Sequence, residues 1–270
     1  MKKNFKLGVI GAGFMANAII NGVLTSGAIT PQEIFVSDIN ANSLEKLKNI
    51  GVNVTLNNSE VFENAEYILL AVKPQTFISM ESDNTDKVEK VISIMAGVNK
   101  AKIKQTFINA KIVRCMPNTP VSVGFGAVAV DCSDLSNEKD VDFVKNIFSA
   151  VAKVVLVNEE DLSAVTGISG SSPAYFYLFA KSLIDAGVAN GLAKADAENL
   201  VLSTMKGAVV MMENRQDKTI DDLINAVCSK GGTTIEAMKV FYDEKLQDIT
   251  LKAVNSCINR ANELEKLWKR

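Results

Sequence analysis

The strongest constraint on the fold lies near the start of the chain, where a short apolar run leads into a glycine-rich turn and then a helical pattern. The apolar run ends at Ile10, the turn reads Gly11-x-Gly13-x-x-Ala16, and the helical run starts at Asn17. A strand, a turn of this spacing and a helix form the dinucleotide-binding fingerprint. Gly11 permits the tight turn, Gly13 lets a pyrophosphate touch the backbone, and Ala16 lets the helix lie close to the strand. The helix N-terminus offers N–H groups to the phosphates.

The composition excludes several classes of protein. The 270-residue chain has a net charge of −2, which leaves no basic surface for nucleic acid. It has no apolar run of the roughly 18 residues that a membrane span needs. Its four cysteines are scattered without a Cys-x-x-Cys pair, which argues against a metal site and favours a reducing cytoplasm. There is no histidine, so triads and metal sites built on histidine are excluded.

The hydrophobic pattern divides the chain into two parts. Residues 1–160 contain apolar runs that alternate with helical segments, which predicts an α/β Rossmann domain with a mainly parallel sheet. Residues 161–270 lose the strand-like runs and show helical periodicity, which predicts an all-helical domain. Its last helix carries an apolar stripe from Leu246 to Trp268, and such helices often pack against a second subunit. The predicted strands span residues 7–10, 33–37, 52–56, 67–72, 90–95, 111–116, 126–130 and 153–157.

Candidate ligand-binding residues follow several predicted strands, at the edge of the sheet where ligands of this fold bind. Asp38 stands where an acidic residue grips the ribose hydroxyl of NAD, or it is a turn residue. Lys73 either faces a phosphate or solvates the edge. The small pair Ala96-Gly97 would let a flat nicotinamide ring approach the backbone. In the helical part, residues 231–234 (Gly-Gly-Thr-Thr) form either a nest for a small anion or a plain turn capped by threonine.

Five motifs occur in the order found in the pyrroline-5-carboxylate reductase family, which the chain resembles over essentially its whole length. They are residues 10–16 (Ile-Gly-Ala-Gly-Phe-Met-Ala), 71–74 (Ala-Val-Lys-Pro), 116–120 (Met-Pro-Asn-Thr-Pro), 167–175 (Gly-Ile-Ser-Gly-Ser-Ser-Pro-Ala-Tyr) and 231–237 (Gly-Gly-Thr-Thr-Ile-Glu-Ala).

The resemblance implies an NAD(P)H-dependent oxidoreductase that reduces the imine of 1-pyrroline-5-carboxylate to L-proline, the last step of proline biosynthesis, in the cytoplasm. It also implies a Rossmann domain followed by an all-helical dimerisation domain, with homodimers that often assemble into decamers. The active site would then lie between the two domains.

The resemblance also assigns roles residue by residue. Thr234 matches the threonine whose hydroxyl meets the ring nitrogen, and we expect it to be the catalytic residue. The substrate loop corresponds to Ser229, Gly231, Gly232, Thr233 and Thr234. The expected cofactor-binding residues are Gly11, Ala12, Gly13, Phe14, Met15, Ser37, Asp38, Asn58, Ala71, Val72, Lys73, Pro74, Ala96, Gly97 and Asn118.

Two positions depart from the family pattern. Lys230 stands where the family usually has proline, which adds a charge to the substrate loop. The family uses NADPH or NADH and often has a basic or hydroxyl-rich turn at residues 38–40; the acidic Asp38 there favours NADH.

Two alternatives fit parts of the pattern. A hydroxyacid dehydrogenase of the Rossmann-plus-helices type would need a helical lysine as acid and base, and Lys181 and Lys206 are candidates by location. A non-catalytic dinucleotide sensor would keep the first glycine turn, but it would have no need for the second.

Overall fold

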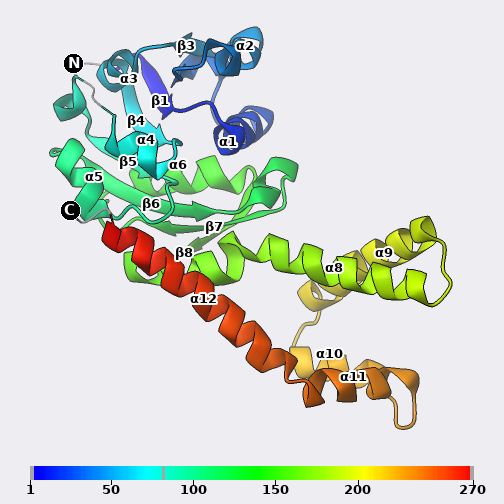
Figure 1. Ribbon diagram of the computed structural model, residues 1–270. Coiled ribbons are helices and arrows are strands. Elements are labelled where there is room, and N and C mark those ends of the chain that lie inside the picture. The colour runs from blue at the N-terminus through cyan, green and yellow to red at the C-terminus, as the bar shows by residue number, and fades with distance from the viewer. Residues whose placement is uncertain (1–2, 81–82, 268–270) are drawn as a thin grey trace. The chain divides into compact units, whose positions relative to one another are not determined.

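The computed structural model describes residues 3–80 and 83–267, and within these ranges eight strands form one sheet (Figure 1). Every neighbouring pair is parallel except β6 and β7, which are antiparallel. The order is β3-β2-β1-β4-β5-β6-β7-β8, so the predicted mainly parallel α/β sheet is confirmed. The strands are β1 (Phe5–Ile10), β2 (Ile34–Ser37), β3 (Asn53–Thr55), β4 (Ala65–Leu70), β5 (Lys90–Ser93), β6 (Lys111–Pro117), β7 (Gly126–Asp131) and β8 (Ala152–Leu156).

Successive residues of the buried strands point to opposite faces of the sheet and are apolar on both. Helices therefore cover both faces. One core cluster joins strand residues such as Leu7 and Val9 to α1, α2 and α6. The other joins Ile10 and Ile68 to α3, α4 and α5. These helices are α1 (Phe14–Thr25), α2 (Ala41–Asn49), α3 (Asn58–Asn64), α4 (Pro74–Ile78), α5 (Lys100–Thr106) and α6 (Glu138–Ser149).

The helical part is all-helical, as the sequence pattern predicts, and it contains elements that were not predicted. The described residues there form α7 (Leu162–Val165), a π-helical turn (Thr166–Gly170), α8 (Ser172–Ala189), α9 (Lys194–Glu213), α10 (Ile220–Val227), α11 (Thr233–Asp243) and α12 (Leu246–Leu267). Helix α10 was not predicted; its signal is the capping box, in which the Thr219 hydroxyl accepts from Asp222 N–H and the Asp222 carboxylate accepts from Thr219 N–H. Trp268, the last residue of the predicted apolar stripe, lies outside the described residues.

The chain forms two compact units, and α12 takes part in both. One unit comprises the residues up to Ser171 together with those from Cys257 onward, and the other comprises Ser172–Ser256. The predicted boundary at residue 161 marks where strands give way to helices in the sequence. The two compact units are instead defined by contacts between residues, so the domain boundary at residue 161 stays a prediction. No described helix is both long enough and apolar enough to cross a membrane.

The Ser172–Ser256 unit has almost no core of its own. Of its apolar side chains, Ala180 and Ala197 are buried on α8 and α9, which pack against each other. Large apolar side chains are exposed along the same helices, among them Phe176, Tyr177, Leu178, Leu200, Leu202 and Met211. Because water-exposed apolar faces of this extent mark association surfaces, this unit is built to be covered by another protein surface.

Candidate functional site

The glycine-rich turn between β1 and α1 has the geometry that the fingerprint requires. Gly11 has a φ of 97°, and a Cβ atom there would lie 2.9 Å from the carbonyl oxygen of Ala71. A side chain at Gly11 is therefore excluded both by backbone conformation and by space. At the N-terminus of α1, by contrast, a Cβ atom on Gly13 would meet no atom within 4 Å. The backbone of Gly13 is thus open, so that another group can approach it closely.

Two side chains hold this turn in place. The amide of Asn17 donates to the carbonyl oxygens of Ala12 and Gly13, at 2.7 and 3.0 Å. The Asp38 carboxylate, directly after β2, accepts from Ala12 N–H at 2.7 Å and from Asn40 N–H at 2.8 Å. Asp38 therefore ties the phosphate turn to the end of β2. No role was predicted for Asn17. The sequence could have indicated one, because an amide side chain one helical turn after the second glycine is within reach of the turn's carbonyl groups.

The residues predicted to read the adenosine lie together beyond β2. Ser37 is fully buried, and its hydroxyl donates to Asn58 Oδ1 at 2.7 Å. Ser37 thus positions Asn58 and does not present its own hydroxyl to solvent. Asp38 and Asn58 are half-buried, and the Phe14 side chain at the start of α1 is 64% exposed.

The segments that follow β4 and β5 reach the same edge of the sheet. Ala71 N–H donates to the carbonyl oxygen of Ile10 at 2.9 Å, which places this segment beside the glycine turn. Lys73 is exposed just before α4. After β5, Ala96 is exposed, whereas Gly97, with a φ of 73°, is buried. The first of the two small residues is therefore the one available to a flat ring.

Asn118, a predicted cofactor residue at the end of β6, uses its side chain within the chain. Its Oδ1 accepts from Ala127 N–H at 2.9 Å, and its Nδ2 donates to the carbonyl oxygen of Ser169 at 3.4 Å. The side chain is largely buried. These bonds fasten the turn of residues 117–120 to β7 and to the π-helical turn, a role that the sequence did not indicate.

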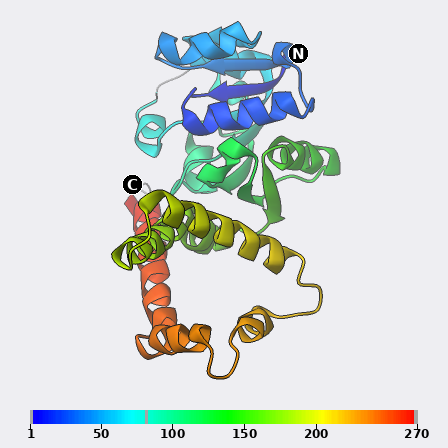
Figure 2. The ribbon, with the colours of Figure 1, turned by 90° about the vertical axis from the view of Figure 1, so that its right-hand side faces the viewer.

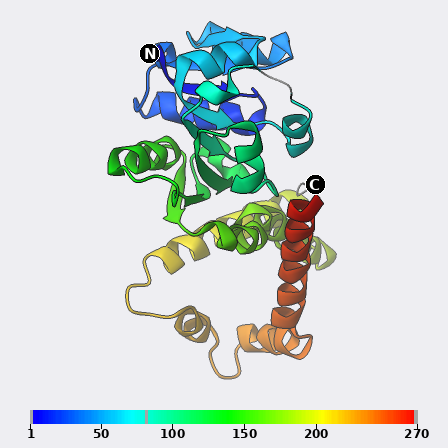
Figure 3. The same ribbon diagram turned by 90° about the vertical axis from the view of Figure 1, so that its left-hand side faces the viewer.

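The predicted substrate residues lie together in the other unit, on the loop between α10 and α11 (Figures 2 and 3). Gly231 has a φ of 77°. Gly232 N–H donates to the carbonyl oxygen of Ser229 at 2.9 Å, and a Cβ atom on Gly232 would lie 2.5 Å from Ser229 Oγ. Thr233 begins α11, so the free N–H groups of that helix end follow directly on the loop. Thr234 is exposed in the first turn, which leaves its hydroxyl available to a ligand.

Two cysteine thiols and Lys181 are titratable groups outside the predicted site. Burial raises the pKa of the Cys115 thiol well above its ordinary value, and burial with the nearby Asp131 carboxylate raises the pKa of Cys132 to about 11. Both thiols therefore stay protonated near neutral pH and are poor nucleophiles. Lys181, a candidate base in one alternative reading, is exposed and pairs with Asp185 on the same helix.

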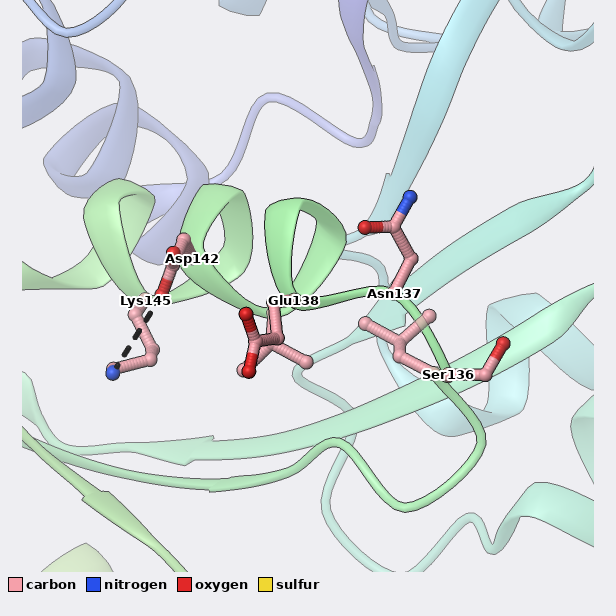
Figure 4. Close-up of a pocket in the computed structure, with 7 residues that line it drawn as sticks. Ser136, Asn137, Glu138, Asp142 and Lys145 are labelled. Carbon is pink, nitrogen blue, oxygen red and sulfur yellow. Dashed lines mark ion pairs between the residues drawn. The ribbon is translucent and has the colours of Figure 1, made fainter.

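A hollow at the start of α6 shares no residue with the predicted site (Figure 4). It is lined by residues that include Ser136, Asn137 and Glu138, and its Asp142 and Lys145 side chains pair at 3.8 Å. These two charges therefore face each other, and the Glu138 carboxylate lines the same hollow.

Comparison with known families and proteins gives a consistent result. Residues 159–264 match the family model described as pyrroline-5-carboxylate reductase dimerisation, and residues 6–97 match the model described as NADP oxidoreductase, coenzyme F420-dependent. The pyrroline-5-carboxylate reductase of Synechocystis is 35% identical over 97% of this chain and 99% of its own length. That of Escherichia coli is 33% identical over 97% and 98%.

The chain belongs to the pyrroline-5-carboxylate reductase family. Solved structures agree: the Plasmodium falciparum enzyme with NADP bound has a TM-score of 0.84 at 30% identity and covers 98% of this chain and 100% of its own. The Coxiella burnetii enzyme has a TM-score of 0.85 at 32% identity, covering 97% and 99%. The chain is an NAD(P)H-dependent oxidoreductase that converts 1-pyrroline-5-carboxylate to L-proline, the last step of proline biosynthesis. The predicted family, fold and reaction are confirmed, and both alternatives are set aside.

The two glycines of the phosphate turn make a matched pair for a test of this reductase. We expect Gly13→Ala to leave the free energy of unfolding within about 0.5 kcal/mol, because the added methyl group meets no atom of the chain. It should raise the KM for the nicotinamide cofactor about tenfold, equivalent to about 1.4 kcal/mol, since the methyl group would stand where we expect the phosphate to approach. Gly11→Ala should instead destabilise the fold. Urea denaturation and steady-state kinetics measure both effects; an unchanged cofactor KM in Gly13→Ala would contradict the assignment.

Proposed function

We propose that the two groups of residues described above bind the two reactants of the reductase. The sheet edge around the glycine turn binds the nicotinamide dinucleotide, and the loop of residues 229–234 binds the pyrroline carboxylate. The assignment of the cofactor-binding residues rests on one observation: the backbone at Gly13 is open, whereas nearby Gly11 tolerates no side chain.

The residues at the sheet edge fit a nicotinamide dinucleotide. The turn after β1 offers backbone to the pyrophosphate, Asp38 and Asn58 follow β2 and β3 where the adenosine ribose is read, and exposed Ala96 offers a flat surface to the nicotinamide. When bound, this group supplies the hydride that reduces the imine carbon.

The substrate loop positions the substrate and does not need to supply a proton from a strong acid. An imine carbon accepts hydride best when its nitrogen is protonated, and the substrate can bring that proton from solution. This fits a chain that contains no histidine. The backbone of residues 231–234 holds the substrate carboxylate, with the N–H groups of Thr233 and Thr234 at the start of α11 as donors. The Thr234 hydroxyl accepts from the protonated ring nitrogen and orients it. Such positioning supplies on the order of 7–11 kcal/mol of the barrier reduction.

Thr234→Ala tests the role of the hydroxyl. We expect kcat to fall between about tenfold and a hundredfold, because a hydrogen bond to a charged group contributes about 1.5–3 kcal/mol. The KM for the cofactor should stay nearly unchanged, since Thr234 is not among the proposed cofactor residues. Thr234→Ser keeps the hydroxyl and should retain most of the activity. Steady-state kinetics with varied substrate and cofactor separate these effects, and equal losses in turnover and cofactor affinity would count against the assignment.

We further propose that NADH serves this enzyme better than NADPH. The Asp38 carboxylate is fixed by Ala12 N–H and Asn40 N–H at the end of β2, where it can accept from a ribose hydroxyl. A 2′-phosphate at the same place would bring a second negative charge close to Asp38, which is unfavourable by about 1 to 4 kcal/mol at 4 Å for effective dielectric constants between 80 and 20.

Asp38→Asn tests this preference. The amide oxygen still accepts from Ala12 N–H, but the negative charge is gone. The ratio of kcat/KM for NADPH to that for NADH should therefore rise about fivefold or more, since 1 kcal/mol corresponds to about a factor of five. Asn42→Asp, which changes an uncharged residue on neighbouring α2, serves as the reverse control and should not raise the ratio. A wild-type enzyme that prefers NADPH, with a ratio indifferent to Asp38→Asn, would refute the proposal.

The enzyme is a homo-oligomer, and we propose a homodimer through the Ser172–Ser256 unit that assembles further into a decamer. The exposed apolar side chains of α8 and α9 support the dimer, because a unit with so little core of its own needs a second copy to bury them. We also propose that it works in the cytoplasm, in keeping with four cysteines that are all free thiols.

Light scattering coupled to size-exclusion chromatography tests the assembly. We expect a mass of ten chains, or of two chains for the dimer alone, and no active fraction at the mass of one chain. An active monomer would overturn the proposal that the helical unit needs a partner, whereas a stable dimer without larger species would remove the decamer only.

A further inference from the structure

The C-terminal end of α12 packs against the turn that follows β5. From Cys257 onward, α12 belongs to the unit that contains the sheet (Figure 1). A Cβ atom on Gly97 would lie 3.0 Å from Leu264 Cβ. Leu264 therefore lies directly on the backbone of the turn whose preceding residue, Ala96, is the exposed one.

A buried arginine fastens this helix end to the sheet. Arg114 lies in β6, is 3% exposed, and donates from Nη1 to Glu265 Oε1 at 2.9 Å and to Glu159 Oε1 at 3.1 Å. Glu265 is the neighbour of Leu264 on α12. A buried charge is tolerated only when it is paired, so Arg114 requires these carboxylates to stay in place.

The second carboxylate connects the same arginine to the far end of the turn. Glu159 Oε1 also accepts from Lys100 N–H at 2.7 Å. Lys100 is the first residue of α5, and residues 94–99 lead from the end of β5 to that helix. Arg114 thus holds α12 above the turn through Glu265 and the start of α5 through Glu159.

We propose that Arg114 and Glu265 are positioning residues for hydride transfer, which fix the Ala96-Gly97 turn through α12 and α5. The inference rests on the proposed function in that the nicotinamide lies against Ala96. Neither side chain touches the reacting atoms. Their effect passes through the turn, where a displacement of the ring by about 1 Å can lower the rate as much as a hundredfold.

Glu265→Gln tests this role in the full-length enzyme. We expect the rate constant of hydride transfer in a single turnover, followed by loss of cofactor absorbance with cofactor equimolar to enzyme and substrate in excess, to fall at least about tenfold. The amplitude and the cofactor KM should stay within about twofold, because the glycine turn and the adenosine residues are untouched. Glu265→Asp keeps the charge and should recover part of the rate. The control is Glu263→Gln on the same helix, which removes an exposed pair with Arg260 and should change neither quantity.

The single-turnover signal separates positioning from structural loss. A merely structural role lowers the amplitude, as fewer molecules are folded, but leaves the rate constant of the folded molecules unchanged; that result overturns the proposal. If Glu265→Gln does not fold, Leu264→Ala takes its place, since it removes the contact on Gly97 and keeps the ion pairs. An unchanged rate constant in Leu264→Ala then overturns the proposal.

Ala96→Leu distinguishes failure of this inference from failure of the proposed site. A bulky side chain at Ala96 should block the ring and abolish activity. Full activity in Ala96→Leu shows that the cofactor assignment itself is wrong. Loss of activity in Ala96→Leu, together with a normal rate constant in Glu265→Gln, shows that the cofactor assignment holds and that the positioning role does not.

Discussion

The close passage of backbone at Gly11 is the constraint on which the rest of the nucleotide-binding unit depends. Its positive φ turns the chain sharply from β1 into α1, and the carbonyl oxygen of Ala71 lies too near to admit a side chain. This geometry brings the start of α1 next to the ends of β2 and β4. Asp38 and Asn17 then use hydrogen bonds to lock the turn, so that its free N–H groups point at a fixed place.

The helical unit differs from the unit that contains the sheet, because it has little apolar core of its own. The side chains buried within it are few and small, notably Ala180 and Ala197, while aromatic and aliphatic groups on α8 remain exposed. A surface of this kind is stable only when another protein surface covers it. The unit that carries the proposed substrate loop therefore also carries the exposed apolar faces.

Buried charges form a second framework beneath the ligand-binding edge. Arg114 is held by carboxylates from two distant parts of the chain, and Lys100 pairs with Asp131 at 2.7 Å. Burial opposes ionisation of Asp131, but the hydrogen bond from Lys100 and those from Ser133 lower its pKa overall. Such pairs add little to stability compared with apolar packing, yet they fix geometry because each partner is costly to remove.

The sequence alone determined the nucleotide-binding turn, the eight strands, the change to helices after residue 160 and the family, because local pattern and spacing carry that information. It also indicated Gly231 and Thr234 as a ligand loop. Only the tertiary structure decided that Ser37 and Asn118 use their side chains inside the chain, and that the end of α12 returns to the sheet. These facts depend on contacts between residues as far apart as Arg114 and Glu265. No periodicity or motif records such contacts, because they arise only when the elements pack.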